Sequence, residues 1–367
     1  MTDLLYGDTE TALRDSVRGL LAKELTTADL LTCYDRPATA DRGLWTRLAQ
    51  ELGLAALLVP EEFGGYGTGA REAAVVLEEL GRRVAPVPFL TSAVVATTAV
   101  VEVGDAELLT GLGAGLTTAA LCLPWTTTVP DPTVRFGDAG RISGKVANVA
   151  DAISSDVLLV PVQTADGCAL ATVDIGAQGV ALSPVTSLDM TRPLADVHFD
   201  GAPARLVAEP PAAGPALDKA LAVGAALLAS EQLGLAEWCL ETTVGYLRER
   251  YQFGRPLGSF QALKHRLADL MQETTTARAV ARYAADCVAT ANDDLWVAAS
   301  LAQAHCSGIA VHAAEECVQL HGGIGMTWEY PAHLHLKRAK ADQLALGTAA
   351  QHRARLGTLV DIPATVR

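Results

Sequence analysis

The chain has 367 residues, of which 50% are apolar and only 5% are aromatic. Single hydrophobic cores stop growing at roughly 250–300 residues, so two or three packed units are expected. The formal net charge of −14, from 28 basic and 42 acidic residues, disfavours nonspecific binding to nucleic acid or to anionic membranes. A local basic pocket for a phosphate-bearing ligand remains compatible with this charge.

The cysteines and the apolar runs indicate a cytoplasmic protein without a membrane span. The seven cysteines are irregularly spaced and form no CxxC pair, which is typical of reduced thiols. The first residues are acidic and lack the apolar core of a signal peptide. The longest apolar runs, near 93–103 and 220–230, are shorter than the ~18–20 residues of a membrane span. No histidine spacing predicts a metal site.

Three parts follow one another along the chain. Residues 1–113 are predicted to be helical, because apolar residues recur at helical spacing from Leu13 to Leu21 and from Leu44 to Leu52. In the last helix of this part, Gly81 is expected near a C-cap, and prolines follow it.

Residues 114–208 hold short β-rich runs separated by Gly, Asp and Pro, which favours a small antiparallel barrel or sandwich. Residues 209–367 return to long helices, one of about 35 residues, which suits a four-helix bundle. The predicted class is therefore α+β, with an N-terminal helical domain, a middle β-domain and a C-terminal helical bundle.

The stretch RERYQFGRPLGSFQALKHRLADL, residues 248–270, joins two of the predicted long helices. Glycines and a proline force a turn there, and Arg250 and Arg255 flank it. One interpretation is a basic corner, because arginine near a helix C-terminus interacts favourably with the helix dipole. The other is an anion clamp, in which Arg250 meets a phosphate while Phe253 packs against a flat ring. The residues alone leave both open.

A second turn, QLHGGIG, spans residues 319–325. One interpretation is an ordinary helix C-cap, where glycine adopts a left-handed conformation at little cost. The other is close approach of a ligand, because Gly322 and Gly323 lack β-carbons and a dinucleotide can lie against the main chain. No strand precedes this turn, so it is not the Rossmann fingerprint.

Together, these two stretches closely resemble the two C-terminal signatures of the acyl-CoA dehydrogenase family. LGLAALLVPEEFGGYGTG and LEELGRRVAPVPFL are similar to the family's N-terminal pattern, so the resemblance covers essentially the whole chain. It implies an FAD enzyme acting on acyl-CoA thioesters. A carboxylate removes the α proton while the β-carbon passes hydride to the flavin, and an electron-transfer flavoprotein then takes the electrons.

The resemblance also implies pairs of dimers in which each FAD is shared. One subunit's β-domain holds the flavin ring, and its neighbour's bundle holds the pyrophosphate and adenine half. The residues implied for the neighbour's part are Arg250, Gln252, Phe253, Gln261, Gln319, Gly322 and Gly323.

The positions at which the family places its catalytic base carry no proton acceptor here. The family's Tyr/Phe-Glu-Gly-Thr stretch reads Ala-Leu-Gly-Thr, so Leu346 stands in place of the glutamate. Some relatives place the glutamate on the first long bundle helix, where this chain has Gly224, followed by Ala225 in place of the usual arginine. Loss of a general base typically costs about 10²–10⁴-fold in rate. No catalytic residue is therefore predicted in this chain.

The β-domain departs from the family pattern as well. Where the family has a Thr-Glu-Pro-x-x-Gly-Ser-Asp-like stretch, this chain reads LCLPWTTTVPDPTVRF, which keeps Pro124 and the threonines 126–128. The family's Trp-Ile-Thr backs the flavin ring, and here Asn148 and Ala150 replace the Trp and the Thr. The part of the β-domain that would hold the flavin ring, the flavin shelf, is thus predicted to have lost its binding residues. The nucleotide-binding half that the chain lends to its neighbour is predicted to keep them.

This asymmetry resembles the base-lacking subunit of actinobacterial α2β2 acyl-CoA dehydrogenases, several of which are linked to steroid side-chain breakdown. A sister subunit would then supply the base and the flavin shelf, with half the usual FAD count. Two alternatives stay open. One is a homo-oligomeric enzyme with an unplaced base, such as Asp342 or Glu231. The other is a structural homologue that holds no FAD.

The alternative bases have ordinary interpretations as well. Asp342 is expected on a solvated helix face with Lys337, Arg338 and Lys340, and exposed carboxylates rarely gain the pKa of a base. Glu231 and Glu237 are expected to face partners or water.

Overall fold

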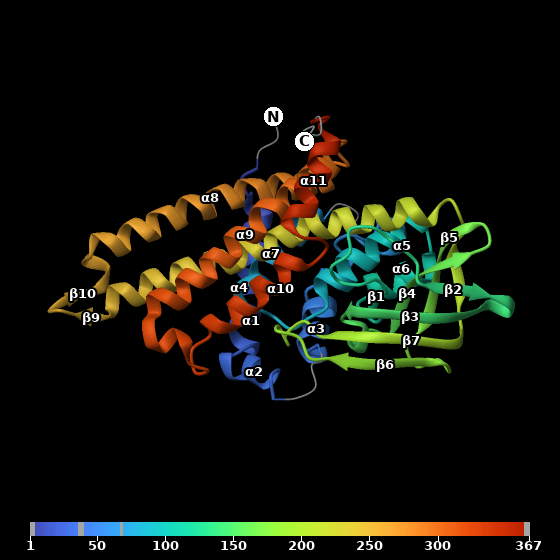
Figure 1. Cartoon of the computed structure of the whole chain (residues 1–367), viewed down its shortest axis with the longest axis horizontal. Coiled ribbons are helices and arrows are strands. Elements are labelled where there is room, and N and C mark those ends of the chain that lie inside the picture. Colours follow the sequence, from blue (N-terminus) through green and yellow to red (C-terminus); the bar gives the residue numbers. More distant parts are fainter. Residues whose placement is uncertain (1–3, 36–39, 67–68, 363–367) are drawn as a thin grey trace, which may run out of the picture. The chain divides into compact units, whose positions relative to one another are not determined.

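The computed structural model describes residues 4–35, 40–66 and 69–362. Helices come first, a β-sheet follows, and long helices complete the chain (Figure 1). The predicted α+β class with this order of elements is confirmed.

The first part is helical, as predicted, but its helices are short and interrupted by irregular turns. The α-helices are α1 (Asp8–Glu24), α2 (Thr27–Thr32), α3 (Arg42–Thr46), α4 (Ala70–Arg83), α5 (Thr97–Val103) and α6 (Ala106–Gly113). Between them lie the short helices η1 (Arg47–Glu51), η2 (Leu54–Ala56), η3 (Glu61–Phe63) and η4 (Phe89–Ala96). Asp41 and Asp105 cap α3 and α6, because each carboxylate accepts a hydrogen bond from a backbone N–H in the first turn.

The middle of the chain forms one eight-stranded sheet in the order β6-β7-β3-β2-β4-β5-β8, with β1 also paired to β4. The strands are β1 (Ala119–Leu121), β2 (Val134–Gly137), β3 (Arg141–Ala150), β4 (Val157–Thr164), β5 (Gly167–Asp174), β6 (Val180–Val185), β7 (Leu194–Pro203) and β8 (Arg205–Ala208). Side chains such as Val134, Leu158 and Phe199 form its buried core.

The sheet is mixed, whereas the sequence predicted antiparallel strands. Strand β4 pairs in parallel with β1 and then with β2, along successive parts of one edge. The other pairings are antiparallel. Short runs with turn residues between them predict strands but not their partners, because pairing depends on crossovers between segments that are distant in sequence.

The last part consists of α7 (Ala213–Glu249), α8 (Gln261–Ala289), α9 (Leu295–His321), α10 (Ala332–Leu344) and α11 (Ala349–Leu359). A two-stranded hairpin of β9 (Tyr251–Gln252) and β10 (Arg255–Pro256) joins α7 to α8, and the short helix η8 (Gly322–Met326) follows α9. Helices α8, α10 and α11 all pack against α9, which is buried along much of its length. Its small residues, mostly alanine, allow this close packing.

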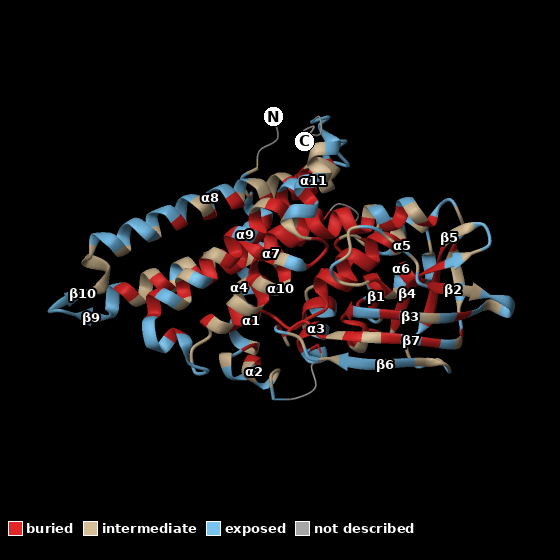
Figure 2. Cartoon of the chain, in the orientation of Figure 1, coloured by how far each residue is buried: buried red, intermediate tan, exposed pale blue. Residues whose placement is uncertain are grey.

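Helix α7 is long and apolar enough to cross a membrane by length and composition alone. However, 94% of its most apolar window is buried inside the protein. Burial among other helices is what the core helix of a bundle requires, and Figure 2 draws its middle turns as buried.

The chain divides into two compact units, which do not coincide with the three predicted domains. The bundle unit comprises Met1–Thr27, Ala74–Ala85 and Ala226–Arg367, and the sheet unit comprises Ala28–Ala73 and Pro86–Ala225. The predicted domain boundaries at residues 113 and 208 stay a prediction, since the units record contacts and not sequence modules.

Within the bundle unit, α4 and α7 cross at two glycines. A β-carbon on Gly81 would lie 2.2 Å from the carbonyl oxygen of Glu231, and one on Gly234 would lie 1.9 Å from that of Glu78. Gly81 lies in the last turn of α4, near the helix end as predicted, but it is not a left-handed cap residue. It lies inside α4 and is required by the close approach of two backbones.

Candidate functional site

The β9–β10 hairpin presents an aromatic side chain at its tip. Gln252 pairs with Arg255, and Phe253 and Gly254 form the turn with backbone φ angles of +54° and +74°. Two left-handed residues make a tight hairpin turn, which ordinarily favours Asn-Gly. Phenylalanine in this conformation is strained by about 1–2 kcal/mol, and its side chain is 89% exposed. Its ring meets that of Phe260 edge-on, with centroids 6.2 Å apart, yet the residue stays largely exposed.

The three glycines after α9 are required for different reasons. Gly322 ends the helix at φ +63° and ψ −137°, a conformation that is essentially confined to glycine. Gly325 packs tightly, because a β-carbon there would lie 2.4 Å from the carbonyl oxygen of Val318. At Gly323 the backbone φ is not left-handed, and a β-carbon would meet no atom within 4 Å. Glycine at 323 is thus explained neither by conformation nor by packing within this chain.

These two segments lie together at one end of the bundle unit. The ring of Tyr246, near the end of α7, stacks on that of His321, the last residue of α9, with centroids 4.4 Å apart. The side chains and glycines predicted to hold a nucleotide are all exposed, as Figure 2 shows for the hairpin. They are Arg250, Gln252, Phe253, Gln261, Gln319, Gly322 and Gly323.

Leu346 lies in a tightly held turn after α10. Its backbone φ is +53°, and the residue is 3% exposed. Nε2 of Gln303 donates to the carbonyl oxygens of Ala345 and Gly347 at 2.9 and 3.3 Å, and Nε2 of His352 donates to that of Leu346 at 2.9 Å. The turn is therefore rigidly positioned, but its central side chain is a hydrocarbon that accepts no proton.

The second base position is equally apolar. Gly224 and Ala225 both lie in the buried middle of α7. At this position too, the chain offers no group that accepts a proton.

Of the acids proposed as alternative bases, Asp342 is not placed as the sequence predicted, whereas Glu231 faces a partner, as predicted. Asp342 is fully buried, and so is Arg338, whose guanidinium forms an ion pair with the buried Glu231. The expected solvated face of α10 is therefore wrong at these two positions. Helix α10 packs on α9, and Arg338 finds its partner on α7, more than 100 residues earlier in the chain. Glu237 is also paired, with Arg82 and Arg278.

In the sheet unit, the stretch after β1 is organised around Trp125. The backbone N–H of Trp125 donates to the carbonyl oxygen of Asn148 at 3.0 Å, and the guanidinium of Arg192 lies 5.6 Å from its ring. Asn148 has φ +55° at an irregularity in the β3–β7 pairing, and its own N–H donates to Asp196. Asparagine tolerates this left-handed backbone, whereas a large aromatic residue is disfavoured there. The local backbone thus suits Asn148 rather than tryptophan.

Comparisons with known proteins establish what kind of chain this is. Residues 7–111 match the profile described as acyl-CoA dehydrogenase, N-terminal domain, and residues 215–359 match that of the C-terminal domain. Over 345 residues the chain is 37% identical to acyl-CoA dehydrogenase IpdE2 of Mycolicibacterium smegmatis, covering 94% of this chain and 96% of the relative.

The chain belongs to the acyl-CoA dehydrogenase family.

Solved structures of similar proteins agree with this assignment. The ChsE4-ChsE5 complex from Mycobacterium tuberculosis holds a chain that is 27% identical with a TM-score of 0.88, covering 99% of this chain and 100% of that one. A chain of the Tcur3481-Tcur3483 steroid ACAD is 33% identical with a TM-score of 0.85, covering 97% and 98%. The family's members are FAD-binding flavoproteins.

The residues of the bundle unit fit the nucleotide half of FAD. Arg250 supplies a cation, Gln252, Gln261 and Gln319 supply amides, and the open space at Gly323 accommodates a ligand against the main chain. Bidentate arginine and backbone approach are the usual means of binding a pyrophosphate. This chemistry is compatible with the functional interpretation of both loops, which stays a prediction.

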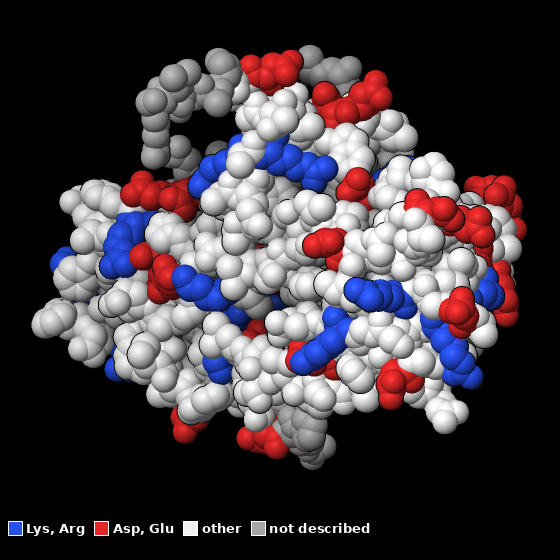
Figure 3. All heavy atoms as spheres, turned by 45° about the vertical axis from the view of Figure 1, so that its right-hand side comes forward, with Lys and Arg blue, Asp and Glu red and all other residues white. Residues whose placement is uncertain are grey.

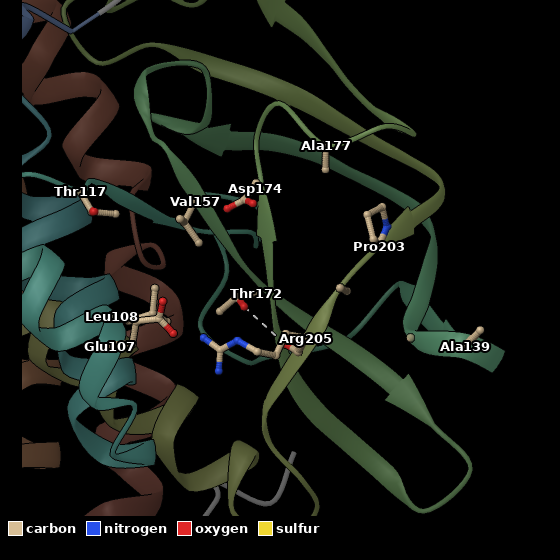
Figure 4. A pocket seen from close by; sticks show the side chains of 12 residues that line it. Glu107, Leu108, Thr117, Ala139, Val157, Thr172, Asp174, Ala177, Pro203 and Arg205 are labelled. Atoms are coloured by element: carbon tan, nitrogen blue, oxygen red, sulfur yellow. Dashed lines mark hydrogen bonds between the residues drawn. The ribbon is translucent and has the colours of Figure 1, made fainter.

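A cavity of about 600 Å³ lies within the sheet unit (Figure 4). Glu107 of α6, Asp174 of β5 and Arg205 of β8 are among the residues that line it. Arg205 forms an ion pair with Asp105 at 2.6 Å. Burial raises the pKa of Asp105, but hydrogen bonds from Arg205 and from the helix N-terminus outweigh it and lower the pKa. With its cation neutralised in this way, the cavity is not a phosphate site.

Proposed function

We propose that this chain is the subunit of a heteromeric acyl-CoA dehydrogenase that lends the nucleotide-binding half of the FAD site and supplies no catalytic base. The observation that carries the proposal is the contrast between two sets of residues. The exposed loops at the end of the bundle unit keep every residue expected for the lent half. The two base positions lack the expected glutamate, and the flavin shelf lacks the expected tryptophan and threonine.

The lent half binds by contacts that this chain provides at its own surface. Arg250 would pair with the pyrophosphate, Phe253 would pack on a flat ring, and Gly323 would let the nucleotide lie against the backbone. Figure 3 shows Lys and Arg scattered among Asp and Glu on the face drawn there, so that face carries no broad basic surface. The residues of the lent half are exposed in the single chain, as a site that is completed by a second subunit requires.

The chemistry of the reaction divides between the two subunits. When bound, FAD supplies the acceptor for the hydride that leaves the β-carbon of the thioester. The α proton needs a carboxylate, and Leu346, Gly224 and Ala225 provide none. Glu231 is held in a buried ion pair with Arg338, which makes it a poor candidate for the missing base. A sister acyl-CoA dehydrogenase subunit would therefore carry the base and the flavin shelf.

The substrate class and the remaining partners follow from the family and its relatives. A structure that is 33% identical to this chain is described as a steroid ACAD, so we propose an acyl-CoA from steroid or other lipid degradation. An electron-transfer flavoprotein would take the electrons. We place the complex in the cytoplasm, as the sequence predicts.

Purification tests the proposal directly. The chain is produced alone and together with a sister subunit that retains the glutamate and the Trp-Ile-Thr stretch, and FAD is measured by absorbance after release. We expect a colourless chain when alone and a yellow, active complex with one FAD per heterodimer. Yellow, active protein from the chain alone would instead support a homo-oligomer with an unplaced base. Absence of FAD in both preparations would support a structural homologue.

A further inference from the structure

His321 lies between the two loops that the proposed function assigns to the FAD nucleotide. It is the last residue of α9 and directly precedes Gly322, yet it is only 2% exposed. Its neighbours in sequence, Gln319, Gly322 and Gly323, are all exposed. A buried polar ring thus stands at the base of an exposed glycine turn.

Both nitrogens of the His321 ring are engaged. Nδ1 lies 2.7 Å from the carbonyl oxygen of Cys317, and a carbonyl only accepts, so Nδ1 carries the proton and donates it. Nε2 lies 2.7 Å from the hydroxyl of Tyr330. Burial raises the pKa of Tyr330 to about 12, so this hydroxyl keeps its proton and donates to Nε2. One tautomer of a neutral ring satisfies both contacts.

These contacts close the glycine turn at both ends. Cys317 lies one helical turn before His321, and Tyr330 lies after the glycine turn, two residues before α10 begins. The hydrogen bond from Tyr330 to His321 therefore ties the end of the 322–330 segment to its start. Gly325 packs inside this closed segment, where a β-carbon would lie 3.0 Å from Cβ of His321.

The same ring also contacts the other loop. Tyr246 of α7 stacks on His321, with 29° between the ring planes. The carbonyl oxygen of Tyr246 accepts a hydrogen bond from the backbone N–H of Arg250, four residues further along the chain. The carbonyl oxygen of Arg250 in turn accepts one from the backbone N–H of Leu257, which lies beyond the hairpin. The position of the hairpin is therefore connected to His321 through a single helical turn.

We propose that His321 is a positioning residue for the lent half of the FAD site. Its ring fixes the glycine turn through Tyr330 and the arginine hairpin through Tyr246, so that the two loops face one nucleotide in a set geometry. This inference rests on the proposed function. Preorganised loops bind a ligand more tightly because less conformational freedom is lost on binding.

The test measures FAD affinity of the complex with the sister subunit, by titrating apoprotein and following flavin fluorescence. His321→Phe keeps an aromatic ring for Tyr246 but removes both hydrogen bonds, and we expect the Kd for FAD to rise about 10- to 100-fold. Tyr330→Phe removes one hydroxyl and should raise it about 3- to 10-fold. At saturating FAD, kcat and the KM for acyl-CoA should stay near those of the wild type, because neither side chain touches the reacting atoms.

His335→Phe is the matched control. His335 is also a buried histidine of the bundle unit that contacts two carbonyl oxygens, those of Pro331 and Arg82, but it contacts neither loop. A comparable loss of thermal stability with unchanged FAD affinity in this control supports the proposal. An equal loss of FAD affinity in the control overturns it, as does a Kd within twofold of the wild type for both His321→Phe and Tyr330→Phe. A wild-type complex that takes up no FAD refutes the proposed function itself, which separates the two failures.

Discussion

The two regions that a flavin enzyme of this family needs have diverged in this chain. At the end of the bundle unit, the hairpin and glycine turn hold strained or otherwise unexplained features, such as the left-handed Phe253 and the uncrowded Gly323. In the sheet unit, Asn148 sits at a strand irregularity whose backbone suits asparagine. One region keeps features that cost stability, and the other has adopted residues that suit its own fold.

Strain that persists at an exposed position, where the ring gains little burial, indicates a function, because the surrounding structure must maintain it. A chain that had lost all contact with FAD would be free to replace Phe253 and Gly323. A chain that bound the whole cofactor would need its shelf. The combination of one maintained region and one relaxed region is what a shared site predicts for the subunit that lends a half.

Of the substitutions considered, a large side chain at Gly323 should reduce FAD binding the most. In the complex with the sister subunit, Gly323→Leu places a side chain where the nucleotide is expected, and FAD affinity should fall about 100-fold or more. Thermal stability should hardly change, because no atom lies within 4 Å of the new β-carbon. Gly176→Leu, at an equally open position in the sheet unit, is the control. Unchanged FAD affinity in Gly323→Leu would mean that the turn is an ordinary helix end.

Restoring a carboxylate at the base position tests whether a base alone would give this chain dehydrogenase activity. Leu346→Glu in the chain alone should yield no dehydrogenase activity, because the flavin shelf is still missing. It should also lower the free energy of unfolding by about 3 kcal/mol, since a charge would replace a side chain that is 3% exposed. Leu344→Glu, at a residue that is 49% exposed, should change it by no more than about 0.5 kcal/mol. Urea unfolding of both variants measures the difference in stability. Acyl-CoA oxidation by the Leu346→Glu chain without a sister subunit would contradict the prediction.

Much of this contrast could be predicted from the sequence, because its signals are local. The order of helices and strands follows from periodicity and turn residues, and the resemblance to the family implies that Leu346 and Gly224 stand at its base positions. What could not be predicted depends on distant partners. The burial of Arg338 depends on Glu231 on another helix, and the charged residues of α10 gave no sign that Arg338 and Asp342 are buried.

The same limit applies to backbone geometry and to His321. That Gly81 marks a helix crossing depends on Gly234, and the parallel pairings of β4 depend on connections that no short run encodes. His321 was noted only for its lack of metal spacing. Its role depends on Tyr246 and Tyr330, which meet it only in the folded bundle.

Between pH 7.5 and pH 5, acid should weaken the bundle unit more than the sheet unit. Burial lowers the pKa of His335 to about 4, and burial also lowers that of His352. Because the folded pKa lies below the ordinary value near 6.5, the unfolded chain binds more protons between these values, and stability falls as pH decreases through this range. His335 alone should account for about 2 kcal/mol between pH 7.5 and pH 5.

Urea unfolding at several pH values measures this loss, and hydrogen exchange locates it. His335→Phe should flatten the pH dependence, whereas His198→Phe, at an exposed histidine on β7, should leave it unchanged. An equal pH dependence in all three proteins would contradict the assignment to His335.

The smallest expected effect is the sharpest test of the relaxed region. The backbone N–H of Trp125 donates to the carbonyl oxygen of Asn148. The indole nitrogen of Trp125 is buried without a hydrogen-bond partner among the described residues. If the sheet unit held a flavin ring, Trp125→Ala would remove a wall of that site and reduce the FAD content of the complex. We expect the FAD content and Kd to stay within twofold of the wild type, with only the stability cost of a truncated aromatic side chain. A loss of FAD comparable to that of Gly323→Leu would mean that this chain binds both halves of the cofactor, and the contrast between the two regions would no longer identify a lent site.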